Sequence, residues 1–259
     1  MIQSGGMKYV PPLIVGNWKL NPGLETEAVD LAKVINRKTP KEAKVTIAIA
    51  PPFIFIPAIA KVLKKAPLFL AAQDVAPEER GALTGEVSLS QLKPYGVTHF
   101  IIGHSERRAL GETDELVNKK IQAVLKQRLT PIVCVGERTR DSQGGFYSIV
   151  EQQLRKAVAG LTPLLTTRMV IAYEPVWAIG TGATATPEDV KEMQLFIVSV
   201  LTKIHDRATA SKVKLLYGGS VKASNAKALH QEGGMNGFLV GGASLDPQEF
   251  GEIIKATAI

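Results

Sequence analysis

Eight short apolar runs alternate with longer amphipathic segments along this chain, and that alternation limits its possible folds more than any other feature. The runs are apolar almost throughout, which is typical of parallel strands buried on both faces. Strands that alternate with helices in this way form a parallel sheet covered by helices. We expect strands at residues 13–16, 45–50, 68–73, 98–103, 131–136, 169–174, 213–217 and 238–240.

The segments between these runs carry helix signals. Thr113 precedes an acidic first turn and Thr186 precedes Pro187, so each Thr stands where a helix N-cap belongs. The link over residues 75–97 is rich in turn residues and has room only for a short helix near residues 88–92. The other expected helices cover residues 25–37, 54–65, 114–128, 146–159, 187–207, 222–231 and 247–257.

No linker or low-complexity segment divides the 259 residues. A single closed (β/α)8 barrel is the simplest α/β fold that fits, because its typical length is about 250 residues. We place this domain at residues 10–259, after a short N-terminal extension over residues 1–9. The alternative is an open doubly wound sheet, which is weakened because no G-x-G-x-x-G signature follows the first strand.

Composition narrows the functional classes. The net charge of +7 suits an anionic substrate, but no basic run with interleaved aromatic residues indicates nucleic-acid binding. No apolar run reaches the roughly 20 residues of a membrane span, and the first residues lack the features of a signal peptide. Cys134 is the single cysteine, which fits a reducing compartment. We therefore expect a cytoplasmic protein that binds neither nucleic acid nor membranes.

Polar residues gather where the strands end, which is where a barrel of this kind places its chemistry. Asn17 and Lys19 follow the first strand, and His104 and Glu106 follow the fourth. Glu174 ends the sixth. Singly, Lys19 could be a surface lysine, Asn17 a turn former and Glu106 a carboxylate at a helix N-terminus. Together they define a candidate site, in which a neutral His104 could donate a hydrogen bond to a carbonyl.

The segment after Glu174 indicates a hinged cover over that site. Pro175 stops the strand, and Gly180 supplies backbone freedom at the far end. The apolar residues 177–179 would need a partner in an exposed loop, and a loop that closes over a small ligand gives them one. The alternative is an ordinary strand-to-helix connection with a surface glutamate.

Two glycine-rich turns indicate a phosphate site. They follow the seventh and eighth strands, where such barrels commonly bind phosphate, and open backbone N–H groups favour an anion. The candidate residues are Ser220, Gly241 and Gly242, with Gly180 as a further donor from the cover.

Cys134 has no adjacent base and is interpreted as a buried small hydrophobe. No His, Cys or Asp cluster has metal-ligand spacing, so neither a metal nor a cofactor is implied.

Five motifs resemble those of the triosephosphate isomerase family in order and spacing. They are Gly16-Asn17-Trp18-Lys19, Gly103-His104-Ser105-Glu106-Arg107-Arg108, the segment from Ala172 to Gly182, Tyr217-Gly218-Gly219-Ser220, and Gly241-Gly242. The resemblance covers the chain from about Val10 to its end. It implies a TIM barrel that interconverts D-glyceraldehyde 3-phosphate and dihydroxyacetone phosphate through an enediol(ate), in glycolysis and gluconeogenesis.

The resemblance also implies a role for each residue. Glu174 would be the base that moves the proton, and His104 the neutral acid that polarises the carbonyl. Lys19 and Asn17 would stabilise negative charge, with Glu106 as a supporting carboxylate paired with Lys19. The phosphate would be held by Gly180, Ser220, Gly241 and Gly242.

Members of the family are usually homodimers, so the resemblance implies a dimer formed through the loop around Thr84. Four positions depart from the usual family residue: Leu20 for Met, Asp74 for Asn, Leu83 for an aromatic residue and Asp246 for Lys. Leu83 slightly weakens the expectation of dimer packing, and we expect none of the four to touch the chemistry.

Two rival functions remain open at this stage. Another phosphosugar isomerase or an aldolase could use the same fold, because the barrel alone does not specify a reaction. An aldolase would need a Schiff-base lysine on a barrel strand, and we expect none there. The second rival is a binding or scaffold protein that keeps the fold without turnover.

Overall fold

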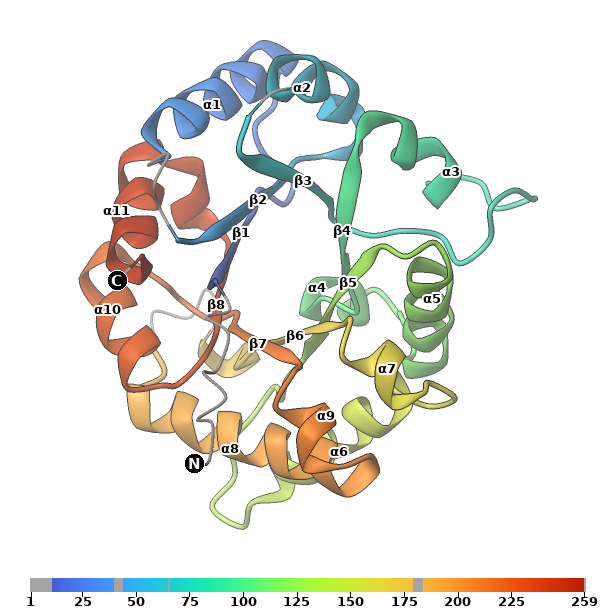
Figure 1. Ribbon diagram of the computed structural model, residues 1–259, viewed down its shortest axis with the longest axis vertical. Helices are drawn as coiled ribbons and strands as arrows, with labels where there is room; N and C mark the ends of the chain where they lie inside the picture. The colour runs from blue at the N-terminus through green and yellow to red at the C-terminus, as the bar shows by residue number, and fades with distance from the viewer. Residues whose placement is uncertain (1–10, 40–43, 65, 179–183, 259) are drawn as a thin grey trace, which may run out of the picture.

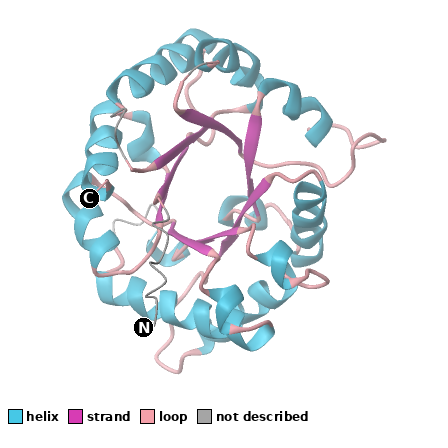
Figure 2. Cartoon of the chain, in the orientation of Figure 1, coloured by secondary structure: helices cyan, strands magenta, loops and turns pink. Residues whose placement is uncertain are grey.

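A computed structural model of the chain describes residues 11–39, 44–64, 66–178 and 184–258. Within them, eight parallel strands pair in sequence order, and β8 pairs back with β1 to close a barrel. Figures 1 and 2 show the strands as an inner ring inside a ring of helices. The closed barrel confirms the predicted (β/α)8 fold and excludes an open doubly wound sheet. The strands are β1 (Leu13–Asn17), β2 (Thr46–Ala50), β3 (Leu68–Ala72), β4 (Val97–Ile102), β5 (Thr130–Val135), β6 (Val170–Tyr173), β7 (Lys214–Tyr217) and β8 (Gly237–Val240).

The outer ring consists of α-helices of very different length. The longer ones are α1 (Glu25–Lys38), α2 (Ile56–Leu63), α5 (Asp114–Lys126), α6 (Gly145–Ala157), α8 (Pro187–Ile204), α10 (Ala223–Gln231) and α11 (Pro247–Thr257). The short ones are α3 (Leu89–Leu92), α4 (Ser105–Ala109), α7 (Pro163–Thr166) and α9 (Arg207–Ala210). Single 3₁₀ turns are η1 (Phe53–Phe55), η2 (Lys93–Tyr95), η3 (Val176–Ala178) and η4 (Gly242–Leu245). None of the described helices is long and apolar enough to cross a membrane.

The predicted strand bounds are right to within one residue, but several helix bounds are wrong. The helix expected to run to residue 207 ends at Ile204, because Asp206 accepts a hydrogen bond from Thr209 N–H at 2.6 Å and caps a new helix, α9. The helix expected over residues 54–65 begins as η1 and becomes α2 only at Ile56. Helix α7 was not expected, and α4 only as the helix whose N-terminus Glu106 could occupy, because each is too short to show a helical period.

Two apolar cores hold the barrel. Side chains that face its interior form one cluster, which includes Leu13, Val15 and Leu216, whereas Ile14 belongs to the layer between strands and helices. This alternation along β1 is the period of a strand whose two faces are both buried. Alanines supply much of the interior at Ala48, Ala50, Ala71 and Ala172. The interior is therefore packed, and a ligand can bind only at its ends.

Candidate active site

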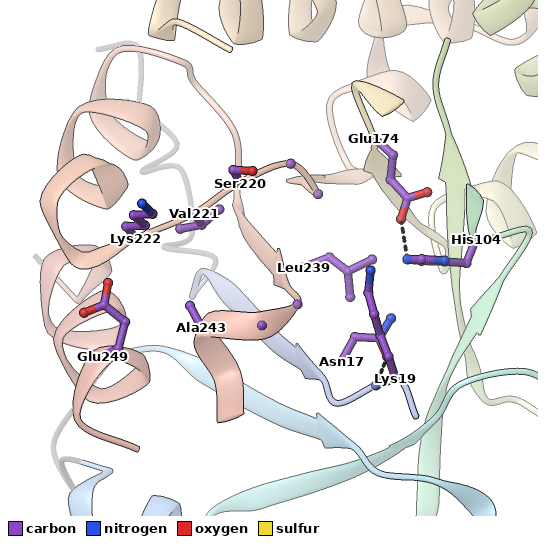
Figure 3. Close-up of a pocket in the computed structure, with 14 residues that line it drawn as sticks. Asn17, Lys19, His104, Glu174, Ser220, Val221, Lys222, Leu239, Ala243 and Glu249 are labelled. Carbon is purple, nitrogen blue, oxygen red and sulfur yellow. Dashed lines mark hydrogen bonds and ion pairs between the residues drawn. The ribbon is translucent and has the colours of Figure 1, made fainter. Parts of the chain in front are cut away.

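A cavity of about 530 Å³ opens at the carboxyl ends of the strands. Of the predicted site residues that the structure describes, it brings together all but Glu106, which lines a neighbouring cavity shared with Asn17, Lys19 and His104. Figure 3 shows Glu174 and His104 on one side and the turn that carries Ser220 on another. The cavity is lined by Asn17, Lys19, His104, Glu174, Gly218, Gly219, Ser220, Val221, Lys222, Leu239, Gly241, Gly242, Ala243 and Glu249.

His104 is held as the N-cap of α4. Its Nδ1 accepts a hydrogen bond from the backbone N–H of Glu106 at 3.2 Å. A nitrogen that accepts carries no proton, so the proton of the neutral ring lies on Nε2. Nε2 lies 3.1 Å from Oε1 of Glu174, on the wall of the cavity. The imidazole is thereby arranged as a hydrogen-bond donor toward the cavity.

Glu174 follows the last residue of β6 and is almost fully buried. Its backbone N–H donates to Val135 O of the neighbouring strand at 2.8 Å, which fixes the point where the side chain leaves the barrel. Oε2 accepts from the backbone N–H of Ser105 at 2.8 Å. A buried carboxylate needs such donors, since an unpaired one is strongly disfavoured.

Lys19 has a strained backbone that its neighbours hold in place. Its φ of 53° is in the left-handed region, which is uncommon for a residue with a side chain. Asn17 Oδ1 accepts from Lys19 N–H at 3.1 Å, and Gln73 Nε2 donates to Lys19 O at 2.8 Å. The ammonium group lies 2.5 Å from Glu106 Oε1. These contacts fix both the backbone and the charge of Lys19 at the edge of the cavity.

The predicted phosphate residues face the same cavity. A side chain at Gly219 would place its Cβ 2.2 Å from Tyr217 Oη, so the turn after β7 tolerates only glycine there. Gly242 has open space where a Cβ would point, which leaves its backbone accessible. Ser220 Oγ donates to Ala178 O at 3.0 Å. Gly180, the fourth predicted phosphate residue, lies outside the described residues.

Comparison with known proteins assigns the chain to a family. The family model described as triosephosphate isomerase matches residues 12–257. The chain belongs to the triosephosphate isomerase family. A triosephosphate isomerase of Caldanaerobacter subterraneus subsp. tengcongensis is 43% identical over 94% of this chain and 98% of its own length. The proteins of the same name from Citrifermentans bemidjiense and Carboxydothermus hydrogenoformans are 44% identical over 94% and 43% identical over 95% of this chain, each over 98% of its own length.

Membership of the triosephosphate isomerase family makes the chain an enzyme of the isomerase class. The match extends across the whole barrel, so every strand end that contributes to the cavity lies within it. A barrel alone would not support this conclusion, because one fold carries many reactions.

The start of the segment after Glu174 differs from what the sequence suggests. Ala178 is fully buried, and Trp177 Nε1 donates to Glu137 Oε1 at 2.9 Å. The inference that these two apolar residues need a ligand as partner is therefore wrong, because the protein itself supplies the partner. The third, Ile179, lies outside the described residues. Glu137 is fully buried and also accepts from Tyr173 Oη at 2.8 Å.

Cys134 lies on β5 inside the barrel and close to Glu174. Burial, and then the negative charge of Glu174, raise the pKa of its thiol well above the usual range. The thiol is protonated and inert at neutral pH, as expected for a buried small residue. Among the described residues, no group of three or more His, Cys, Asp or Glu could hold a metal ion.

Several residues at the site were not singled out from the sequence. Ser105 contributes only its backbone N–H, which no side-chain pattern reveals. Leu239 lines the cavity from β8, and alternation along that strand could have indicated it. Lys222 and Glu249 line its far end, at the start of α10 and in the first turn of α11.

Proposed function

We propose that this cavity is the active site for the reaction of the triosephosphate isomerase family, the interconversion of D-glyceraldehyde 3-phosphate and dihydroxyacetone phosphate in glycolysis and gluconeogenesis. The observation that carries the proposal is the position of Glu174 and His104 together on one side of a cavity whose other side is formed by glycine-rich turns. A three-carbon substrate can then place its carbons against Glu174 and His104 and its phosphate against the glycine-rich turns.

Glu174 is the general base. Its carboxylate removes a proton from one carbon of the bound triose and returns it to the neighbouring carbon, through an enediol(ate) intermediate. The Ser105 N–H orients the carboxylate through its hydrogen bond to Oε2. A residue that shuttles one proton between adjacent carbons must reach both, which suits a carboxylate at a strand end.

His104 is the electrophile for the carbonyl oxygen. Because Nδ1 accepts from Glu106 N–H, the ring presents a neutral Nε2–H donor to the substrate. Lys19 and Asn17 stabilise the negative charge that develops on the same oxygen atoms. Glu106 acts on the ammonium group of Lys19 at 2.5 Å and does not touch the reacting proton.

The phosphate is bound by neutral amides and one hydroxyl, those of Ser220, Gly241, Gly242 and Gly180. Gly241 lies against Lys19, since a Cβ there would be 3.4 Å from Lys19 Cε, so the lysine charge also favours an anion at this point. The cover over residues 175–186 excludes water, which matters because an exposed enediolate can eliminate its phosphate.

The assembly that we propose is a cytoplasmic homodimer, joined through the loop around Thr84. This loop lies in the link between β3 and α3, which projects from the barrel in Figure 1. Leu83 is 44% exposed there, as an apolar residue at an interface would be in a single chain. A second cavity of about 310 Å³ beside the active site, lined by Leu20, Phe53 and Leu110 among others, gives the loop of a second copy a place to insert. The enzyme has no proposed partner beyond a second copy and its triose phosphate.

The aldolase alternative needs a correction. A lysine does lie on a barrel strand: Lys214 begins β7. Its Nζ donates to Pro11 O at 3.2 Å, at the amino-terminal end of the barrel and away from the cavity. Lys214 therefore cannot reach a substrate bound beside Glu174, and the isomerase remains the function that the site supports best.

Replacing Glu174 with Asp tests its role as the base. The shorter side chain keeps the charge but withdraws the carboxylate from the substrate carbons, so kcat should fall by roughly two or more orders of magnitude while KM changes little. Steady-state kinetics with D-glyceraldehyde 3-phosphate give both constants. A rise in KM at unchanged kcat would show that Glu174 only binds the substrate.

A further inference from the structure

A lysine is buried at the edge of the active site without contributing to it. Lys120, on α5, is 1% exposed, and its ammonium group lies 2.7 Å from Asp74 Oδ1 and 2.5 Å from Glu112 Oε1. Arg107 Nε lies 3.0 Å from the other oxygen of Asp74. Two carboxylates thus balance two cations, which a buried charge requires.

Asp74 connects three elements that converge on Lys19. It comes two residues after the end of β3, directly after Gln73, whose side chain holds the backbone carbonyl of Lys19 at 2.8 Å. Through Lys120 it contacts α5, and through Arg107 it contacts α4. The residue next to Arg107 is Glu106, the carboxylate that pairs with the Lys19 ammonium group.

The Lys19–Glu106 pair depends on the position of α4. Within a single chain the Glu106 side chain is 56% exposed and that of Lys19 29%, and ion pairs this exposed contribute little on their own. Helix α4 spans only Ser105–Ala109 and has no length from which to gain rigidity. On one side Arg108 ties it to Asp114 at 2.6 Å and to Gly103 O at 2.8 Å. On the other side, the described residues offer Asp74 as its ionic anchor.

We propose that Asp74 is a positioning residue for the reaction: its buried pair with Lys120 gives Arg107 a fixed anchor, which holds α4 and keeps Glu106 against Lys19. The inference rests on the proposed function, since it assumes that the Lys19 charge acts on the substrate. The proposal runs against the expectation that the departure from the family at Asp74 leaves the chemistry untouched, and the experiment below decides between the two.

The test is a double-mutant cycle between Asp74→Asn and Glu106→Gln, with Glu112→Gln as the matched control. An asparagine keeps the shape and can still accept from Lys120, but its amide group repels the Arg107 guanidinium instead of attracting it. Glu112→Gln also removes one carboxylate from Lys120 but leaves the Asp74–Arg107 pair intact. Each variant is assayed for kcat and KM, for thermal unfolding, and for oligomeric state by sedimentation.

We expect Asp74→Asn to lower kcat/KM about fivefold, in the range of coupling between contacting residues, and to lose that effect in the Glu106→Gln background. Glu112→Gln should lower the unfolding temperature as much as Asp74→Asn does and change kcat/KM less than about twofold. Equal kinetic losses in the two single variants, or independent effects of Asp74→Asn and Glu106→Gln, would overturn the inference. So would full activity of Asp74→Asn. Full activity of Glu106→Gln would overturn the inference and also the proposed role of Glu106. It would not affect the proposed role of Glu174, which the Glu174→Asp variant tests separately.

Discussion

His99 lies toward the amino end of β4 and His104 just beyond its carboxyl end, and the two imidazole rings have different surroundings. His104 is at the carboxyl end, where the Glu106 N–H fixes its tautomer. His99 lies near the amino end, with Nδ1 2.8 Å from Thr98 Oγ1 and its ring edge-on to Phe69. Burial, and then the charge of Lys214, lower the pKa of His99 from 6.5 to about 4. His99 is therefore neutral in the folded protein over a pH range in which it is charged in the unfolded chain.

This difference predicts a loss of stability in acid. Between pH 6.5 and 4 the unfolded chain binds a proton at His99 that the folded protein excludes, so the free energy of unfolding falls as the pH falls. This change in pKa corresponds to at most about 3 to 4 kcal/mol. His99→Gln, which cannot titrate, should show a correspondingly smaller decrease in urea unfolding between pH 6.5 and 4. Identical pH dependence of the two proteins would contradict the assignment.

At the scale of single residues, the sequence predicts which residues belong to the site better than it predicts what those residues contact. Glu174, His104 and Lys19 could be placed because each follows a recognisable strand, and all three line the cavity. Their partners could not: Ser105 acts through its backbone, and Gln73 reaches Lys19 across more than fifty residues of sequence. Such contacts depend on the closed barrel rather than on any local pattern.

Arg140 connects the two flanks of the cover. Its Nε lies 3.3 Å from Glu137 Oε1, which holds Trp177 near the start of the cover. Its Nη1 lies 2.7 Å from Asp189 Oδ1, in the first turn of α8 after the cover. The guanidinium also lies 5.6 Å from the centre of the Trp177 ring. Elements far apart in sequence are thus joined by one side chain.

Removing the Arg140 side chain should lower the free energy of unfolding by more than breaking an ordinary surface ion pair does. Arg140→Met leaves the fully buried Glu137 without its cation, at a cost of about 3 kcal/mol. The matched control is Arg155→Met, which breaks an exposed pair with Glu151 and should cost less than about 1 kcal/mol. Urea unfolding of both variants measures the difference, and equal losses would show that the Arg140 network is not a structural anchor.

Helices and strands follow from the sequence where an apolar run or an end signal marks them. All eight strands and α11 are recovered with bounds right to within a residue, because apolar runs and Pro247 mark them clearly. The sequence does not reveal the break between α8 and α9 or the five-residue α4. Both depend on capping hydrogen bonds, at Asp206 and at His104, which leave no periodic pattern.

For the whole molecule, closure of the barrel is what assembles the site. Asn17 on β1 and Gly241 after β8 lie at opposite ends of the sequence, yet pairing of β1 with β8 brings both to one cavity. The alternation of strands and helices fits a closed barrel and an open doubly wound sheet, and the chain length favours the barrel. An open sheet would leave those two residues apart. Association with a second copy cannot be derived from the sequence in the same way, since it would depend on the shape of a surface and not on a periodic pattern.

The proposed dimer can be tested in solution. Sedimentation should give a mass about twice the 27.8 kDa of the chain, and Thr84→Arg should shift the protein toward monomer by placing a charge in the interface. Ser142→Arg, an exposed change in the link before α6, is the matched control and should leave the mass unchanged. A monomeric wild-type protein at micromolar concentration would exclude the dimer.

The most direct test of the proposed activity is conversion of D-glyceraldehyde 3-phosphate by the purified protein, coupled to detection of dihydroxyacetone phosphate. We predict fast turnover by the wild type and loss of about three or more orders of magnitude in Glu174→Gln, which has the same size but no base. An inactive wild type that still binds phosphate would indicate a scaffold, and an active Glu174→Gln would show that another group moves the proton.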